Sequence, residues 1–371
     1  MSSEEKETAM NQKKLGGEKM RIRHFNILFF VLATFGIWAL SSPIYAQPSK
    51  KAPAIKKPVK VEKVGSVPKT FITAASGPIG GTFLPYVGGL AVYSSEAIDG
   101  LTVSIEATGG STENAHLIGR KESHIGIAHG STIFNAYRGL DEYKGKVYKD
   151  LRGLFRTYGN VAHIVTLKKT GIKTVEDLKG KRISMGTAGS GSAISGEKFL
   201  RHLKLWDALK AVHLPAIEAS EALKDGRLDA YNWHTGLPSA AIVDTAATHS
   251  KEMVLLNLHK PAEQSGFYKA FPYYSFREIP AKTYQGQEQP VPSWDTGCFI
   301  IAHKDLDPQI AYLILKAYFS EEGKKYAIAV HASAKETTIQ DALNGFTIPL
   351  HPGAVRFWEE KGLKIPAELR P

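Results

Sequence analysis

The sequence predicts an α/β protein of two lobes, with mostly parallel sheets and two crossings between the lobes. Short β-type runs alternate with segments of helical spacing, which is typical of parallel sheets. The same order of strand, glycine-rich loop and helix occurs twice, once from residue 71 and once from residue 181. A chain of 371 residues also exceeds the size at which one core usually divides, about 250 to 300 residues.

The first occurrence begins with a strand at 71–75, a glycine loop at 76–82 and a helix at 83–97. A second strand at 101–107, a second glycine loop with its helix at 108–120 and a third strand at 124–128 follow. Ser111 or Thr112 can cap the second helix, which runs to Arg120. The second occurrence has a strand at 181–185, a glycine loop at 186–192, helices at 193–205 and 217–223, and a strand at 228–231.

Two extended runs, 162–168 and 297–303, lie on either side of the second occurrence and are the natural crossings between lobes. We therefore expect one lobe from residues 70–165 together with 297–371, closed by helices at 307–320 and 354–362. The other lobe comprises residues 166–296. Ligands of such sheets bind at the carboxyl ends of the strands, where the glycine loops lie.

The positive charge is concentrated in the N-terminal tail. Residues 1–69 hold 13 Lys and Arg against 5 acids, a net of +8 out of +11 for the chain. A nucleic-acid groove needs clustered basic residues on the folded body, so this distribution argues against nucleic-acid binding. The single Cys298 excludes an intrachain disulfide and a zinc site built on paired cysteines.

The first 69 residues are typical of an export signal followed by a spacer. Arg21 and Arg23 precede an apolar stretch at 25–40 and a region of small residues that ends at Ala46. We predict a signal peptide over 1–46, with an uncleaved signal anchor as the alternative. Residues 47–69 are rich in Lys and Pro and predict an extended linker. The folded body is therefore expected in the periplasm, membrane-tethered if the signal is uncleaved.

Three glycine-rich segments precede predicted helices and are candidate anion sites. They are Gly80-Gly81-Thr82, Gly109-Gly110-Ser111 and Gly189-Ser190-Gly191-Ser192. A helix N-terminus offers free N–H groups and a partial positive charge, which suit a small carboxylate. The alternative is that these glycines only turn the chain. The motifs for dinucleotide and phosphate-loop binding are incomplete, so no nucleotide cofactor is expected.

The sequence contains few candidate residues for catalysis or metal binding. His129 and His234 follow predicted strands and can line the cleft, and neither has an evident carboxylate partner, so ligand hydrogen bonding is favoured over base catalysis. Arg156 can clamp a carboxylate with two hydrogen bonds, or else pair with another surface group. No metal site is predicted. Cys298 lies in an apolar run and is expected to be a buried small side chain.

Five stretches spread over the folded body carry a resemblance to a known family. They are FITAASGPIGGTFLPYVGGLA from Phe71, IEATGGSTEN from Ile105, AHIVTLKKTGIKTVEDLKGKRISMGTAGSGSA from Ala162, EALKDGRLDAYNWHTGLPSAA from Glu221 and NGFTIPLHPGAVRFWEEKGL from Asn344. Together they resemble the TAXI class of TRAP-transporter solute receptors. The resemblance implies a type II-like periplasmic binding protein that closes on a small carboxylate and delivers it to a TRAP membrane permease.

The resemblance also implies ligand contacts. Its binding loops correspond to Gly80–Thr82, Thr108–Ser111 and Gly189–Ser192, and the segment from Tyr231 to Gly236 corresponds to a wall of the second lobe. The sequence departs from the family at His129, where Gln is common, and at Arg156, where a small residue is common. These departures change the size and hydrogen bonding of the pocket, so glutamate does not follow as the ligand.

The sequence thus predicts a solute receptor without catalysis, whose ligand is an acidic amino acid, dicarboxylate or keto acid. Two alternatives stay open. One is an exported enzyme that acts on a small carboxylate through His129 or His234. The other is an exported sensor that reports ligand occupancy to a membrane partner.

Overall fold

The computed structural model describes residues 61–371, all within one structural unit. The predicted signal segment 1–46 and residues 47–60 of the predicted linker lie outside the described residues. No helix within 61–371 has the length and apolar character to cross a membrane.

One mixed sheet of ten strands runs through the molecule. The strands are β1 (Gly65–Ala75), β2 (Ile98–Glu106), β3 (Ile125–His129), β4 (Leu151–Leu167), β5 (Arg182–Ser184), β6 (Lys210–Val212), β7 (Ala230–Thr235), β8 (Met253–Leu255), β9 (Ser275–Ile279) and β10 (Val291–His303). Their order is β2-β1-β3-β10-β4-β7-β5-β6, with β8 beside β4 and β9 beside β10. Pairing is parallel in the outer part of each half and antiparallel around β4 and β10.

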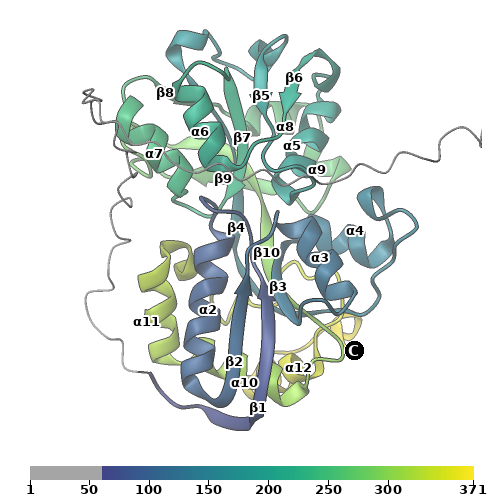
Figure 1. Cartoon of the computed structure of the whole chain (residues 1–371). Helices are drawn as coiled ribbons and strands as arrows, with labels where there is room; N and C mark the ends of the chain where they lie inside the picture. Colours follow the sequence, from purple (N-terminus) through teal and green to yellow (C-terminus); the bar gives the residue numbers. More distant parts are fainter. Residues whose placement is uncertain (1–60) are drawn as a thin grey trace, which may run out of the picture. The chain divides into compact units, whose positions relative to one another are not determined.

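Helices cover both faces of this sheet (Figure 1). They are α2 (Phe83–Ala97), α3 (Ser111–Gly119), α4 (Gly130–Arg138), α5 (Gly191–His202), α6 (Ala216–Lys224), α7 (Ala240–His249), α8 (His259–Gln264), α9 (Phe267–Ala270), α10 (Pro308–Tyr318), α11 (Glu321–Val330) and α12 (Pro352–Glu360). The order of strand, glycine loop and helix predicted for each half is present in β1 and α2 and in β5 and α5.

Strands β4 and β10 are long enough to belong to both halves of the sheet (Figure 1). The first part of β4 pairs with β10, and from Val161 it pairs with β7. The buried apolar residues divide at the same place, since Tyr158 packs in one core and Val161 in another. The two halves therefore meet near Asn160 and its cross-strand partner Thr296. The exact lobe bounds predicted from the sequence stay a prediction.

Strand β1 begins at Gly65, earlier than the predicted strand at residue 71, and includes residues 65–69 that were predicted as linker. Parallel pairing with β2 explains the difference, because Gly65 and Ser66 lie opposite Ile98 and Asp99. Pro68 lies within the irregular step between Ser66 and Thr70, where the missing N–H breaks no regular ladder bond. The Lys and Pro content of residues 65–69 predicted a linker, whereas pairing with β2 makes this segment part of a strand.

Candidate functional site

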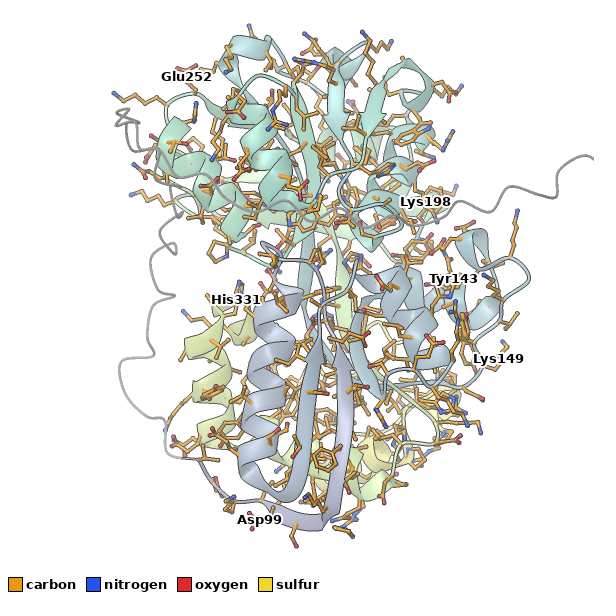
Figure 2. The ribbon with its side chains drawn as sticks, in the orientation of Figure 1. Asp99, Tyr143, Lys149, Lys198, Glu252 and His331 are labelled. Carbon is orange, nitrogen blue, oxygen red and sulfur yellow. The ribbon has the colours of Figure 1, made fainter. Side chains whose placement is uncertain are left out.

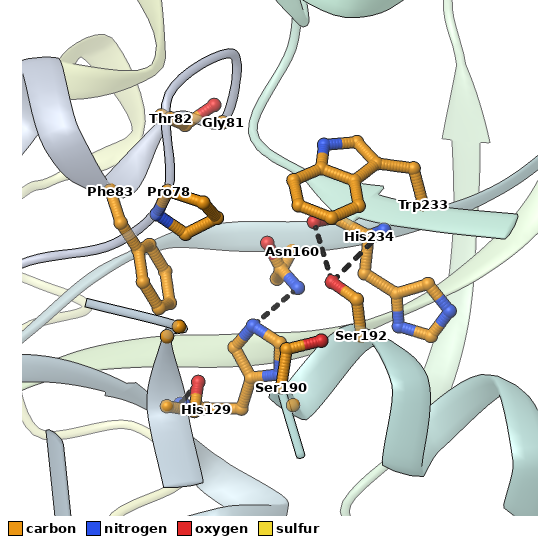
Figure 3. A pocket seen from close by; sticks show the side chains of 14 residues that line it. Pro78, Gly81, Thr82, Phe83, His129, Asn160, Ser190, Ser192, Trp233 and His234 are labelled. Atoms are coloured by element: carbon orange, nitrogen blue, oxygen red, sulfur yellow. Dashed lines mark hydrogen bonds between the residues drawn. The ribbon is translucent and has the colours of Figure 1, made fainter. Parts of the chain in front are cut away.

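A small pocket lies where the two halves of the molecule meet (Figure 3). Its volume is about 20 Å³, which is room for about one water-sized group. The lining residues are Pro78, Gly81, Thr82, Phe83, Gly109, Gly110, Ser111, His129, Asn160, Ser190, Gly191, Ser192, Trp233 and His234. The first eight come from one half, the last five from the other, and Asn160 comes from the crossing strand β4.

Four helices begin at this pocket. The residues that precede α2, α3, α4 and α5 are Thr82, Gly110, His129 and Ser190, and all four line it. Each N-terminus carries a partial positive charge of about half an elementary charge, and the N–H groups of its first turn have no partner within the helix. No Lys, Arg, Asp or Glu among residues 61–371 lines the pocket. Its electrostatic character therefore comes mainly from helix dipoles, which favour an anion, while the Glu113 carboxylate accepts from the N–H of Gly109 at 2.6 Å and offsets part of the α3 dipole.

Most of the predicted site residues lie in this pocket. Those that line it are Gly81, Thr82, Gly110, Ser111, His129, Ser190, Gly191, Ser192 and His234. Three glycine loops that are far apart in sequence therefore converge on one point. Whether these residues contact a ligand stays a prediction.

Three other predicted residues lie next to the pocket without lining it. The carbonyl of Gly80 accepts a hydrogen bond from Ser239 Oγ at 3.4 Å, which joins the two halves. Thr108 Oγ1 accepts from the N–H of Gly110 at 3.1 Å and so shapes the second glycine loop. The buried Tyr231 hydroxyl is 3.0 Å from Thr245 Oγ1, inside the core of its own half.

Arg156 does not line this pocket. It lies on β4 at a second and larger cavity, together with Asp295 and Thr296. The pairing of β4 with β10 is irregular between Gly297 and Phe299, the partner of Arg156. Such an irregularity redirects a side chain and cannot be anticipated from alternation along the strand. The predicted carboxylate clamp in the first pocket therefore lacks Arg156.

His129 is buried and has one protein partner. Its Nε2 lies 2.6 Å from Asn160 Nδ2. Because the amide nitrogen can only donate, Nε2 accepts, and the proton of the neutral ring lies on Nδ1. Burial lowers the pKa of His129 from 6.5 to about 3, so the ring is neutral at physiological pH. Its Nδ1–H has no hydrogen-bond partner and is a free donor.

His234 and Trp233 contribute two further ring nitrogens without a partner, His234 Nδ1 and Trp233 Nε1. The Nε2–H of His234 donates to Asn232 Oδ1 at 3.1 Å, which leaves Nδ1 as an acceptor. Burial lowers the pKa of His234 well below its usual value, and the neighbouring His129 and His163 lower it further. Buried polar atoms are nearly always hydrogen-bonded in folded proteins. Three unpaired ring nitrogens around one pocket are therefore typical of a binding site.

The predicted serine hydroxyls are already engaged within the protein. Ser190 Oγ accepts from the N–H of Ala193 at 3.1 Å and caps α5. Ser192 Oγ donates to the carbonyl of His234 at 3.2 Å (Figure 3), and Ser111 Oγ accepts from the N–H of His129 at 3.1 Å. These hydroxyls hold the loops in place. The groups left for a ligand are backbone N–H groups, ring nitrogens, and the O–H groups of Ser111 and Ser190, which only accept in these contacts.

Sequence reasoning missed Pro78 and Asn160 as lining residues. Phe83 packs edge-on against the His129 ring, with centroids 5.4 Å apart. Asn160 carried no distinct signal, because it lies before the predicted crossing at 162–168 in a strand that holds several other polar residues. Trp233 lay inside the wall segment that the family resemblance implied.

The site has few means for acid–base or metal chemistry. His129 is held by an amide, His234 by another amide, and neither histidine contacts a carboxylate. Within residues 61–371 no group of three or more His, Cys, Asp or Glu side chains is arranged to hold a metal ion. The arrangement can bind and orient a small polar molecule through dipoles and hydrogen bonds.

Two α/β halves joined by two crossing strands, with glycine loops facing each other, define the periplasmic binding protein fold. The chain belongs to the NMT1-like family, whose model matches residues 74–362.

Solved structures of periplasmic proteins are similar to this chain at low identity. The periplasmic aliphatic sulphonate binding protein SsuA from Escherichia coli is 14% identical, with a TM-score of 0.42 over 81% of this chain and 95% of its own. The periplasmic binding protein BugD is 14% identical, with a TM-score of 0.48 over 80% and 94%. MatC from Rhodopseudomonas palustris, solved with bound malate, is 14% identical, with a TM-score of 0.44 over 70% and 88%.

Proposed function

We propose that the protein is a periplasmic solute receptor that binds a small carboxylate in the pocket between its two halves. The convergence of four helix N-termini on a pocket without charged side chains carries the proposal. Helix N-termini bind carboxylates through N–H groups and their dipoles. The free donors His129 Nδ1–H and Trp233 Nε1–H add two partners for ligand oxygens.

Binding requires movement of the halves. A pocket of about 20 Å³ admits no molecule much larger than water, so a carboxylate enters when the halves separate about β4 and β10. Closure then brings Thr82 onto the other half, where its Oγ1 lies 2.9 Å from Thr235 Oγ1 and donates to the carbonyl of Gly236 at 3.1 Å. With a ligand bound, the halves lie farther apart than in this structure, and the ligand favours that partly closed form because it offers contacts from both halves.

The delivery partner in this proposal is a TRAP permease of the TAXI class. The resemblance of the five sequence stretches supports it. TRAP uptake depends on a sodium gradient, so uptake of the bound carboxylate that persists without sodium and requires ATP would assign the receptor to another transporter class.

A thermal-shift screen of succinate, 2-oxoglutarate, L-malate, L-glutamate and L-aspartate tests the binding proposal. We expect at least one of them to raise the midpoint of unfolding in a concentration-dependent manner, because a ligand of the native state stabilises it by mass action. Nucleotides serve as anionic controls and should have no effect. Stabilisation by nucleotides, with none by any carboxylate, would refute the proposal.

The enzyme alternative is tested with the same ligands. Conversion of a bound carboxylate that is lost in His129→Ala or His234→Ala, while binding survives, would establish catalysis. Unchanged ligand after prolonged incubation with the wild-type protein supports a receptor.

A further inference from the structure

A second cavity of about 400 Å³ lies beside the crossing strands, within the size range of small-molecule sites. It also draws on both halves, since Arg156 and Asp341 belong to one and Tyr273 to the other. It shares no lining residue with the first pocket, although His129 and Gly130 are adjacent in sequence and Asn160 pairs with Thr296 across the strands.

The charged groups of this cavity are of opposite sign and do not pair with each other. Arg156 is half-buried and forms no ion pair or side-chain hydrogen bond with any residue in 61–371. Asp295 is only 5% exposed, and its single side-chain partner is the hydroxyl of Ser275 at 3.0 Å. A buried carboxylate held by one hydroxyl is poorly compensated, and burial accordingly raises its pKa even though Arg277 and Arg156 oppose the effect.

Two glycines keep part of the cavity wall free of side chains. Gly130 begins α4, whose N-terminus has no side-chain cap. Gly297 keeps space beside the guanidinium, because a Cβ there would lie 3.2 Å from Arg156 Nε.

We propose that this cavity is a second ligand site, which takes an α-amino acid as a zwitterion. The ligand carboxylate binds the Arg156 guanidinium, which suits two parallel hydrogen bonds. The ligand ammonium binds the Asp295 carboxylate. A zwitterion satisfies both charges at once, whereas a simple anion leaves Asp295 uncompensated and a simple amine leaves Arg156 unpaired. The site goes beyond the carboxylate pocket and does not depend on its ligand.

The test begins with isothermal titration of the twenty standard L-amino acids into the full-length protein. The tightest binder is then compared with two analogues, the same acid without its amino group and the same amine without its carboxylate. We expect each analogue to bind at least about tenfold more weakly. Equal binding of the acid analogue would overturn the zwitterion assignment, and a lack of binding by every amino acid would overturn the site.

Variants then locate the site. Arg156→Gln and Asp295→Asn should each weaken amino acid binding at least about tenfold, whereas Arg152→Gln removes the same charge from the same strand and should have no effect. Trp233→Phe changes only the first pocket and should also leave amino acid affinity intact. Circular dichroism and thermal midpoints check that each variant folds, and Arg156→Lys, which keeps the charge, should bind with intermediate affinity.

The outcomes distinguish the two sites. Loss of amino acid binding in Trp233→Phe together with full binding in Arg156→Gln would overturn the second site and leave the carboxylate pocket standing. Loss of amino acid binding in Arg156→Gln and Asp295→Asn, with wild-type amino acid binding in Trp233→Phe, supports the second site even if every carboxylate fails in the first pocket.

Discussion

Gly191 offers a direct test of whether closure of the two halves is needed for binding. It is the first residue of α5, it has no left-handed φ, and it faces the other half of the molecule. A Cβ at this position would lie 2.5 Å from His129 Nδ1 and 2.9 Å from Ser111 Cβ, both in the opposite half. Alanine at position 191 is therefore compatible with the helix backbone, but its methyl group clashes with the opposite half in the closed form.

The expected loss of ligand affinity follows from the overlap of the added methyl group with the opposite half. Ordinary contact begins at 3.4 Å, so the halves must separate locally by about 0.9 Å to admit the methyl group. Overpacking of this kind costs about 1 to 3 kcal/mol, which corresponds to a loss of about 5- to 150-fold in affinity for a ligand that binds the closed form. The unfolding free energy of each half should change little.

Small-angle scattering and titration measure the two consequences. Gly191→Ala should have a larger radius of gyration than the wild type, and the carboxylate identified by thermal shift should bind more weakly. Gly88→Ala is the matched control, because a Cβ there lies 3.6 Å from Ile105 Cδ1, an ordinary contact in the middle of α2. Wild-type affinity and wild-type scattering in Gly191→Ala would refute the closure mechanism.

Three further predictions concern the same closed form. Thr82→Val removes two hydrogen bonds between the halves and should weaken carboxylate binding by about 1 to 3 kcal/mol in titration, whereas Thr102→Val, on an exposed position of β2, should not. Asp141→Asn breaks the 2.7 Å ion pair with Lys198 across the halves; Figure 2 labels Lys198 in one half and Tyr143, close to Asp141 in sequence, in the other. Because Asp141 is half exposed, the loss should be below about 1 kcal/mol and vanish at high salt. The unfolding free energy should fall as pH drops below 6.5, by up to about 1.4 kcal/mol per pH unit for each buried histidine, and His129→Gln should show a shallower dependence in denaturant titrations.

The sign of the pH dependence follows from the lowered pKa of His129. In the unfolded chain the ring takes up a proton near pH 6.5, whereas in the folded protein it does so only near pH 3. Between these values the unfolded state binds more protons, so acid favours unfolding. The contribution is fully present above pH 6.5 and is lost as the pH falls toward 3. A stability that is independent of pH over this range would show that His129 is not buried in neutral form.

The glycine loops could be predicted because their signal is local. A glycine and a small hydroxyl residue between a β-type run and a helical run mark a helix N-terminus, and Gly81, Gly110 and Gly191 were identified in this way. Parallel pairing then requires these N-termini to lie at the same edge of the sheet. The convergence of the loops was therefore predictable even though the closeness of the two halves was not.

The fourth N-terminus carried the same local signal and was overlooked, because Gly130 and Ser131 follow β3 directly and begin α4. The position of Arg156 was not predictable in this way. The direction of the Arg156 side chain depends on the register of β4 against β10, which lie more than a hundred residues apart in sequence and pair irregularly at this point. A shift of one residue moves every side chain to the opposite face. The pairing of β4 with β10, which the alternation of residues along one strand does not encode, therefore determines which cavity Arg156 lines.

The unpaired ring nitrogens affect both ligand binding and the closure of the two halves. A buried donor or acceptor without a partner costs about 1 to 3 kcal/mol, and closure buries His129 Nδ1, His234 Nδ1 and Trp233 Nε1 in this condition. In the open form solvent can pair with these atoms. The two Thr82 hydrogen bonds that favour closure are worth about 0.5 to 1.5 kcal/mol each, so together they offset only part of the penalty of the three unpaired atoms. A ligand whose oxygens accept from the two N–H donors removes most of the penalty and also adds contacts of its own. In the proposed receptor mechanism, the polar atoms that the protein leaves unpaired are therefore what makes closure depend on the ligand.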